Sequence, residues 1–175
     1  VVVDFSAPVL PPQNETVVAK SDVFVRDGQY ASQSFGNNSY LVVKSDGVGY
    51  SRKTALQFDL TGLDIGSAST AILRLHIRNV NADPSRDITI SRLSSSNWQE
   101  SNLTWNTMPV VDQVGATVAI TPSQIGSWLE VDVSELIQAG TVSLLLENNG
   151  PASGKSDVSF SSRESGNGPE LIVTP

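Results

Sequence analysis

The alternation of apolar and polar residues with a period of two is the feature that most constrains the fold of this chain. It recurs in short segments that are bounded by Gly, Pro, Asn, Asp or Ser. Because the side chains of a strand point alternately to its two faces, this period predicts strands with one buried face. We expect strands near residues 15–20, 22–26, 39–44, 52–59, 70–79, 87–93, 117–121, 127–133, 141–147, 157–162 and 170–174. So many short strands in 175 residues predict one all-β domain, a sandwich or a barrel.

Residues 71–78 form the clearest of these strands. The side chains predicted to face the core are those of Ala71, Leu73, Leu75 and Ile77. The side chains predicted to face outward are those of Arg74, His76 and Arg78. One face of this strand is therefore expected to be core and the other to be basic.

Two further segments carry local signals. The alternation over residues 54–60 places Thr54, Leu56 and Phe58 inward. Ser134 precedes a short stretch that ends before Gly140, which predicts a single helical turn through residue 138 with Ser134 as its N-cap.

A long connection is expected between residues 95 and 116, and it contains Trp98 and Trp105. Connections of this length are uncommon without a function. Two roles are open for the tryptophans: they pin the connection to the core, which we favour, or they line a ligand surface.

Composition narrows the class of protein. The chain has no cysteine, so core packing alone must hold it together. Its net charge of -7 argues against a general nucleic-acid binder, and no apolar run is long enough to span a membrane. The proline-containing residues 1–13 are predicted to be the remnant of a linker, and residues 14–175 the folded module. The chain is therefore expected to be a piece of a longer protein. We also expect the module to be a monomer.

An ordered set of short motifs gives a family resemblance over almost the whole chain. The set comprises Asp22-Val23-Phe24-Val25, Phe35-Gly36-Asn37, Leu41-Val42-Val43, Arg52-Lys53, Phe58-Asp59-Leu60, Ala71 and Leu73, Trp98 with Glu100, Leu103-Thr104-Trp105-Asn106, Pro109, Trp128 with Asp132-Val133, Phe160-Ser161-Ser162-Arg163-Glu164, and Pro169-Glu170-Leu171. In this order the motifs resemble the DNRLRE-type extracellular β-sandwich domains and their relatives in the alginate-binding carbohydrate-binding module family ninety-six. The chain departs from the name-giving motif, where it has Ser162-Arg163-Glu164.

The resemblance implies a single-domain, jelly-roll-like antiparallel β-sandwich that is secreted and attached to a polysaccharide lyase, a hydrolase or a surface protein. We therefore expect a non-catalytic module that binds an acidic polysaccharide, alginate before other uronate polymers, and targets a tethered catalytic domain to it. A structural or adhesive spacer domain of a secreted or cell-surface protein is the alternative. A small enzyme is a third and weaker hypothesis, because no pair of carboxylates has a spacing that indicates acid and base catalysis.

Cationic side chains are the preferred ligand candidates, because aromatic residues make up only 6% of the chain and uronates carry carboxylates. Arg74, His76 and Arg78 form the first group. Lys44, Arg52 and Lys53 extend that face if their strands are neighbours, and Tyr50 offers a ring for stacking against a sugar. Arg163 either binds ligand or makes an internal ion pair.

One structural Ca²⁺ is the only cofactor that the sequence suggests. β-Sandwich modules can hold this ion between loops through carboxylates and backbone carbonyls. Asp22, Asp27 and Glu164 are the candidate ligands, although their spacing matches no EF-hand. His76 is the only histidine, so a His-rich metal site or a catalytic triad has no other histidine to use.

Overall fold

The computed structural model describes residues 13–81 and 86–175. All but one of the residues of the predicted linker lie outside these ranges. The described residues form strands and short 3-10 turns, with no α-helix among them, and none of their helical segments has the length and apolarity needed to cross a membrane.

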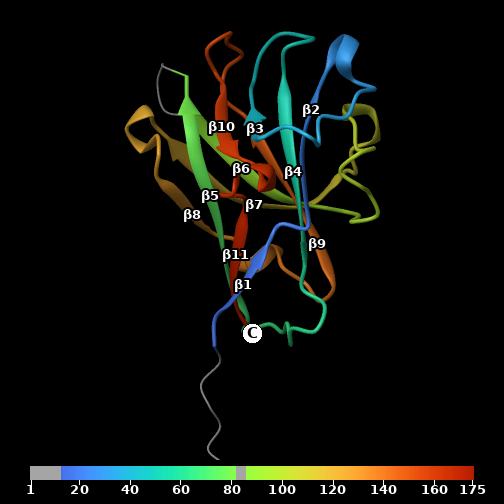
Figure 1. The fold of residues 1–175 in the computed structure, drawn as a ribbon, viewed down its shortest axis with the longest axis vertical. Helices are drawn as coiled ribbons and strands as arrows, with labels where there is room; N and C mark the ends of the chain where they lie inside the picture. The colour runs from blue at the N-terminus through green and yellow to red at the C-terminus, as the bar shows by residue number, and fades with distance from the viewer. Residues whose placement is uncertain (1–12, 82–85) are drawn as a thin grey trace, which may run out of the picture.

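Two antiparallel sheets make up the fold, which confirms the predicted all-β sandwich (Figure 1). The first sheet contains β1 (Glu15–Val18), β11 (Glu170–Thr174), β5 (Thr70–Val80), β10 (Val158–Ser161), β3 (Tyr40–Val43) and β8 (Trp128–Asp132). The second has the order β2 (Ser21–Arg26), β4 (Arg52–Asp59), β9 (Thr141–Asn148), β6 (Arg86–Leu93) and β7 (Val111–Ile120). β1 and the C-terminus lie at the bottom of Figure 1, and the loop between β3 and β4 lies at the top.

Strand β5 is the centre of the first sheet. Its first half pairs with β11 on one side and with β8 on the other, and its second half pairs with β10. The residues predicted to face inward, Ala71, Leu73, Leu75 and Ile77, are at most 1% exposed. Full burial of a leucine or isoleucine side chain is worth about 1.5–3 kcal/mol, so this face anchors the sheet to the core.

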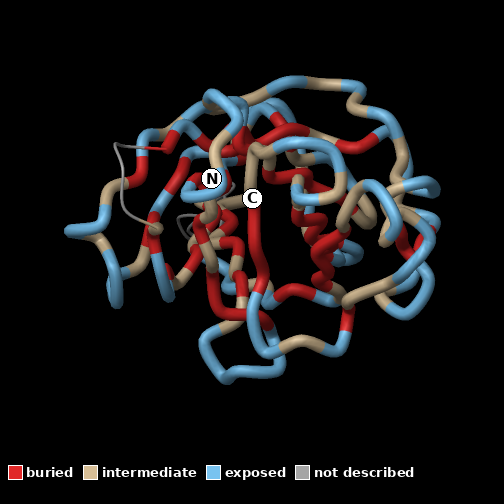
Figure 2. Tube along the Cα trace, turned by 90° about the horizontal axis from the view of Figure 1, so that it is seen from above, coloured by how far each residue is buried: buried red, intermediate tan, exposed pale blue. Residues whose placement is uncertain are grey.

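The middle of the second sheet is buried on both faces. Thr54, Leu56 and Phe58 face the first sheet and have no exposed surface, as predicted. Ala55 and Gln57, on the other face of β4, are buried as well, because the connection between β6 and β7 covers them. Figure 2 shows buried segments running through the interior and exposed segments concentrated at the turns.

Trp98 pins that connection to the second sheet. It is 9% exposed, packs in a second apolar cluster with Val23, Val25 and Leu145, and donates a hydrogen bond from Nε1 to Ser143 Oγ at 3.0 Å. Trp105 is only partly buried and lies beside the same cluster. The structural role that we favoured for the tryptophans therefore describes Trp98.

Two local predictions had the right kind of element but the wrong bounds. The connection is shorter than expected because β7 begins at Val111, where an irregular register against β6 interrupts the alternation that marks a strand. The turn that begins at Ser134 is a 3-10 turn that ends at Leu136, and Ser134 is not its cap. The Ser134 hydroxyl instead accepts a hydrogen bond from Ala71 N–H and donates one to Asp132 Oδ1.

Candidate carbohydrate-binding site

The outward face of β5 carries the predicted basic residues, but its first arginine has internal partners. Arg74 Nε lies 3.1 Å from Glu130 Oε1, and Arg74 Nη1 lies 3.1 Å from Glu170 Oε2. The guanidinium also covers the ring of Trp128, 4.6 Å from its centroid. Two carboxylates therefore already occupy the group that was expected to meet a ligand carboxylate.

The other two side chains of this face also have protein contacts. His76 Nδ1 lies 3.1 Å from Ser161 Oγ, and its ring meets the edge of Trp128. Arg78 is exposed and donates from Nη1 to the carbonyl oxygen of Ser39 at 2.6 Å. Of the three residues, Arg78 retains the most freedom to contact a ligand.

The second predicted group comes together at the loop end of the sandwich, where β3 leads into β4. Lys44 and Arg52 form an isolated antiparallel bridge, and Lys53 follows directly. Lys44 Nζ lies 2.7 Å from Asp46 Oδ2, and Lys53 Nζ lies 2.6 Å from Glu147 Oε1. The hydrogen bond from Lys44, followed by that from the Gly47 N–H, lowers the pKa of Asp46. Both lysine charges are thus balanced locally.

Two arginines at the same end of the sandwich lack ion pairs of the kind that the two lysines form. Arg26, the last residue of β2, is the register partner of Arg52 on β4. Within residues 13–81 and 86–175 neither guanidinium forms an ion pair, and Arg26 Nε is buried without a hydrogen-bond partner. Burial first, and then the charge of Arg26, lower the pKa of Arg52. Like charges directly opposite on neighbouring strands destabilise a sheet, so this pair is unfavourable for folding alone.

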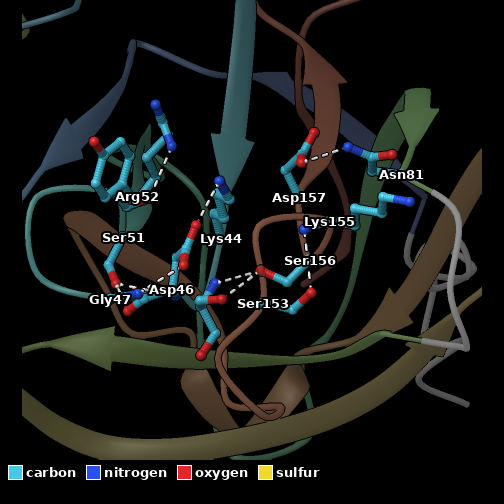
Figure 3. Close-up of polar contacts among 12 residues, drawn as sticks. Lys44, Asp46, Gly47, Ser51, Arg52, Asn81, Ser153, Lys155, Ser156 and Asp157 are labelled. Carbon is cyan, nitrogen blue, oxygen red and sulfur yellow. Dashed lines mark hydrogen bonds and ion pairs between the residues drawn. The ribbon is translucent and has the colours of Figure 1, made fainter.

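The surroundings of this arginine pair hold each guanidinium in place. Arg26 Cζ lies 3.8 Å above the centroid of the Tyr30 ring, and Arg52 Nη1 donates to the Tyr50 carbonyl oxygen at 2.8 Å. In Figure 3, Lys44 turns toward Asp46 and Asp157 toward Asn81, while Arg52 lies apart from both carboxylates. The arginines are therefore oriented without a direct ion pair, and the charges of Asp157, Asp27 and Asp46 act on Arg52 only from beyond contact distance.

A hollow of about 350 Å³ opens beside the pair. Its lining consists of Arg26, Gly28, Gln29, Tyr30, Val48, Gly49 and Tyr50. Tyr50 is 60% exposed and Val48 is 88% exposed. Two smaller hollows, of about 230 and 260 Å³, are lined by Lys44 and by Arg52, the register partner of Arg26, together with Glu147 in one and Asp157 in the other. Together they form a polar, cationic surface with exposed aromatic rings, which we call the arginine cleft.

Close approach of two backbones forms the floor of the arginine cleft. A Cβ on Gly28 would lie 2.5 Å from Gly49 Cα, and Gly28 has a φ of +62°. Glycine therefore satisfies two requirements here, since it tolerates the left-handed conformation and leaves room for the loop that carries Tyr50.

A separate group of carboxylates lies between β2, the connection after β6 and the turn after β10. One oxygen each from Asp22, Glu100 and Glu164 lie within 4.8 Å of one another. Burial first, with smaller contributions from Glu164 and Glu100, raises the pKa of Asp22 to about 7, although a hydrogen bond from the Arg163 backbone opposes the rise. Arg163 Nη1 pairs with Glu100 Oε2 at 3.0 Å, which is the internal contact considered for this residue.

The third predicted metal ligand lies elsewhere. Asp27 Oδ1 accepts a hydrogen bond from Ser51 N–H, and Asp27 is not part of the carboxylate group. Asp22 and Glu164 are brought together as expected, and Glu100 takes the third position.

Sequence reasoning missed Arg26, Tyr30 and Glu100 as site residues. Arg26 and Tyr30 flank the Asp27-Gly28 turn, which has no signal of its own for ligand binding, and only the register of β2 on β4 reveals the arginine pair. Glu100 was part of the family resemblance, so the sequence did contain a signal that could have added it to Asp22 and Glu164.

Comparisons with solved structures find chains that are similar to this one over most of their length. The chain is similar, at 12% identity and a TM-score of 0.41, to a cleaved adhesin domain of Lys-gingipain from Porphyromonas gingivalis, with 93% of this chain and 98% of that chain covered. It is similar, at 11% identity and a TM-score of 0.37, to the CBM22-1 xylan-binding domain of Xyn10C from Paenibacillus barcinonensis, with 95% and 97% covered.

A third similar structure is the CBM51 domain of a GH95 protein from Clostridium perfringens in complex with methyl-galactose. The identity is 14%, the TM-score is 0.33, and 90% of this chain and 99% of that chain are covered. At these values none of the three structures carries an argument about the ligand. A search of curated protein sequences found no match.

The family model gives a more specific result. Residues 13–175 match the model of carbohydrate-binding module family 96, which is nearly the whole chain and the same span that the two sheets occupy. This agrees with one of the two relatives named from the ordered motifs. The chain belongs to carbohydrate-binding module family 96.

Proposed function

We propose that this module binds an acidic polysaccharide, alginate or another uronate polymer, in the arginine cleft. The observation that carries the proposal is the pair Arg26 and Arg52, which lie opposite each other without a carboxylate partner among the described residues. Arginine keeps its charge at neutral pH and presents a planar fork that matches a carboxylate. Successive uronate carboxylates would relieve the repulsion between the two guanidinium groups.

The rings of the cleft support the same ligand class. Tyr50 is exposed beside the arginines, and a sugar ring can cover its apolar face while the tyrosine hydroxyl stays hydrated. Lys44 and Lys53 retain donor protons beyond their ion pairs with Asp46 and Glu147. The cleft thus combines carboxylate recognition with sugar stacking.

The module acts by attachment rather than by chemistry in this proposal. We infer that it is a secreted, monomeric and non-catalytic part of a longer protein whose catalytic domain it holds near the polymer. A tether converts encounters of that domain with the polymer into intramolecular events, so even weak binding raises the local substrate concentration.

Affinity electrophoresis tests the ligand class. We expect gels that contain alginate or pectate to retard the domain, gels that contain neutral glucan not to retard it, and added salt to reduce the retardation because it screens ion pairs. Unchanged mobility in every gel would favour a spacer domain instead. Release of unsaturated ends from the uronate polymers would show an enzyme.

Replacement of Gly28 by alanine tests the floor of the arginine cleft. The new methyl group would overlap Gly49 Cα, displacing the loop that carries Tyr50, and we expect the affinity for uronate oligosaccharides to fall at least about tenfold, which is 1.4 kcal/mol. Unfolding in urea should show a loss of roughly 2–4 kcal/mol, from positive φ together with overpacking.

Gly62→Ala is the matched control. Gly62 has a φ of +92° and nothing within 4 Å of the added carbon, so it loses only about 1–2 kcal/mol from backbone strain. Its affinity should equal that of the unmodified domain. Equal affinities for both variants would mean that the floor of the cleft does not contribute to binding.

A further inference from the structure

The carboxylate group of Asp22, Glu100 and Glu164 joins three segments that are far apart in the sequence. Glu100 Oε1 accepts a hydrogen bond from Asp22 N–H, and Asp22 Oδ2 accepts one from Arg163 N–H, each at 2.8 Å. The segment before β3 closes the arrangement, because a Cβ on Gly36 would lie 2.5 Å from the carbonyl oxygen of Glu100. The fold therefore fixes the Asp22 and Glu100 carboxylates, and Glu164 adds an exposed carboxylate beside them.

One oxygen of the group has no partner. Asp22 has no exposed surface, and its Oδ1 is buried without a hydrogen bond from any described residue. A buried polar atom in this condition is costly, and a buried carboxylate more so. When Asp22 is ionised, the partner that Oδ1 lacks is a donor or a cation.

Glu164 has a second incompletely satisfied oxygen. The Ser162 hydroxyl lies 2.7 Å from both Glu164 Oε2 and the Asn38 carbonyl oxygen. A hydroxyl has one proton and can donate to only one of these acceptors. When it serves Asn38, the exposed Glu164 carboxylate has no donor from this hydroxyl.

The charges do not balance either. Three carboxylates face one guanidinium, that of Arg163, which lies 3.0 Å from Glu100 Oε2 and 3.9 Å from Glu164 Oε1. With all carboxylates ionised the group carries two uncompensated negative charges, which a divalent cation would neutralise.

We propose that Asp22, Glu100 and Glu164 bind one Ca²⁺ that ties β2 to the connection after β6 and to the turn after β10. All donors are oxygens, which hard cations prefer. Two oxygens that bind the same Ca²⁺ at 2.3–2.6 Å lie at most about 5 Å apart, and the oxygens of the group meet this limit. Ca²⁺ also tolerates an irregular ligand set that Mg²⁺ does not.

Thermal unfolding of the 175-residue chain in EDTA, CaCl₂ and MgCl₂ tests the site. At free Ca²⁺ one hundred times its dissociation constant we expect the melting temperature to rise by roughly 5–10 °C, and titration calorimetry to give one site per chain. Mg²⁺ should produce a much smaller rise. No rise with Ca²⁺, or an equal rise with Mg²⁺, would overturn the proposal.

Isosteric variants locate the ion. Asp22→Asn and Glu164→Gln should each abolish or strongly reduce the response to Ca²⁺. In EDTA, Asp22→Asn should melt at or above the temperature of the unmodified chain, because it removes a buried charge that faces two others. Asp112→Asn and Glu130→Gln remove exposed carboxylates that pair with Arg92 and Arg74 and should keep the full response. A full response in Asp22→Asn and Glu164→Gln would place the ion elsewhere and contradict the assignment.

Discussion

Replacement of both Arg26 and Arg52 by alanine should reduce the affinity for uronate oligosaccharides about 100-fold or more. A hydrogen bond to a charged group contributes about 1.5–3 kcal/mol, and two such contacts therefore account for at least two orders of magnitude. The fold should tolerate the change, because the two guanidinium groups repel each other and form no ion pair with any described residue. Isothermal titration calorimetry and urea unfolding of the same sample separate the two effects.

Arg74 and Arg78 provide the matched control, since they are the two arginines that sequence alone favours. Arg74 is held between Glu130 and Glu170 and Arg78 donates to Ser39, so Arg74→Ala combined with Arg78→Ala should keep most of the affinity. If this control loses binding while the Arg26 and Arg52 variant retains it, the ligand lies on the face of β5 and our assignment of the cleft is wrong.

Replacement of Trp98 by alanine should produce the largest loss of stability, about 3–5 kcal/mol, as expected for a large aromatic side chain removed from a packed site. The indole fills the cluster between the second sheet and the connection after β6, and its N–H bonds to Ser143, which is 1% exposed. Urea denaturation measures the loss. The change acts on the fold, so protein that remains folded at low temperature should still bind uronates.

Trp98→Phe keeps part of the packing and removes the hydrogen bond. The phenyl ring is smaller than the indole, so the variant loses the bond to Ser143 and some apolar contact, while Ser143 keeps its hydrogen bond to Ser96. We expect a loss of about 1–2 kcal/mol. A variant at this position with unchanged stability and no binding would instead make Trp98 a ligand contact.

The sandwich was predictable because its period-two pattern reports directly on burial. Thr54, Leu56 and Phe58 were assigned to the core from alternation alone and have no exposed surface. The pattern failed where a second layer intervened. Ala55 and Gln57 are buried under the connection after β6. Their burial depends on where that connection lies in the fold, which alternation within one strand does not report.

The candidate site was predictable only in part, because charge in a sequence does not show which charges are already paired. Arg74 is the most conspicuous cation of the clearest strand, yet its partners Glu130 and Glu170 come from two other strands. Arg52 was named, but its position opposite Arg26 depends on strand register. Asp22 and Glu164 were likewise named without Glu100, because long-range contacts unite the three.

Titration of ¹⁵N-labelled protein with oligomers of alginate, followed by nuclear magnetic resonance, tests the central claim most directly. Our account predicts that the largest shifts fall on residues 26–30 and 48–53, which surround the arginine cleft, and that these shifts diminish as salt is added. Shifts centred on the outward face of β5, or their absence at every residue, would contradict it.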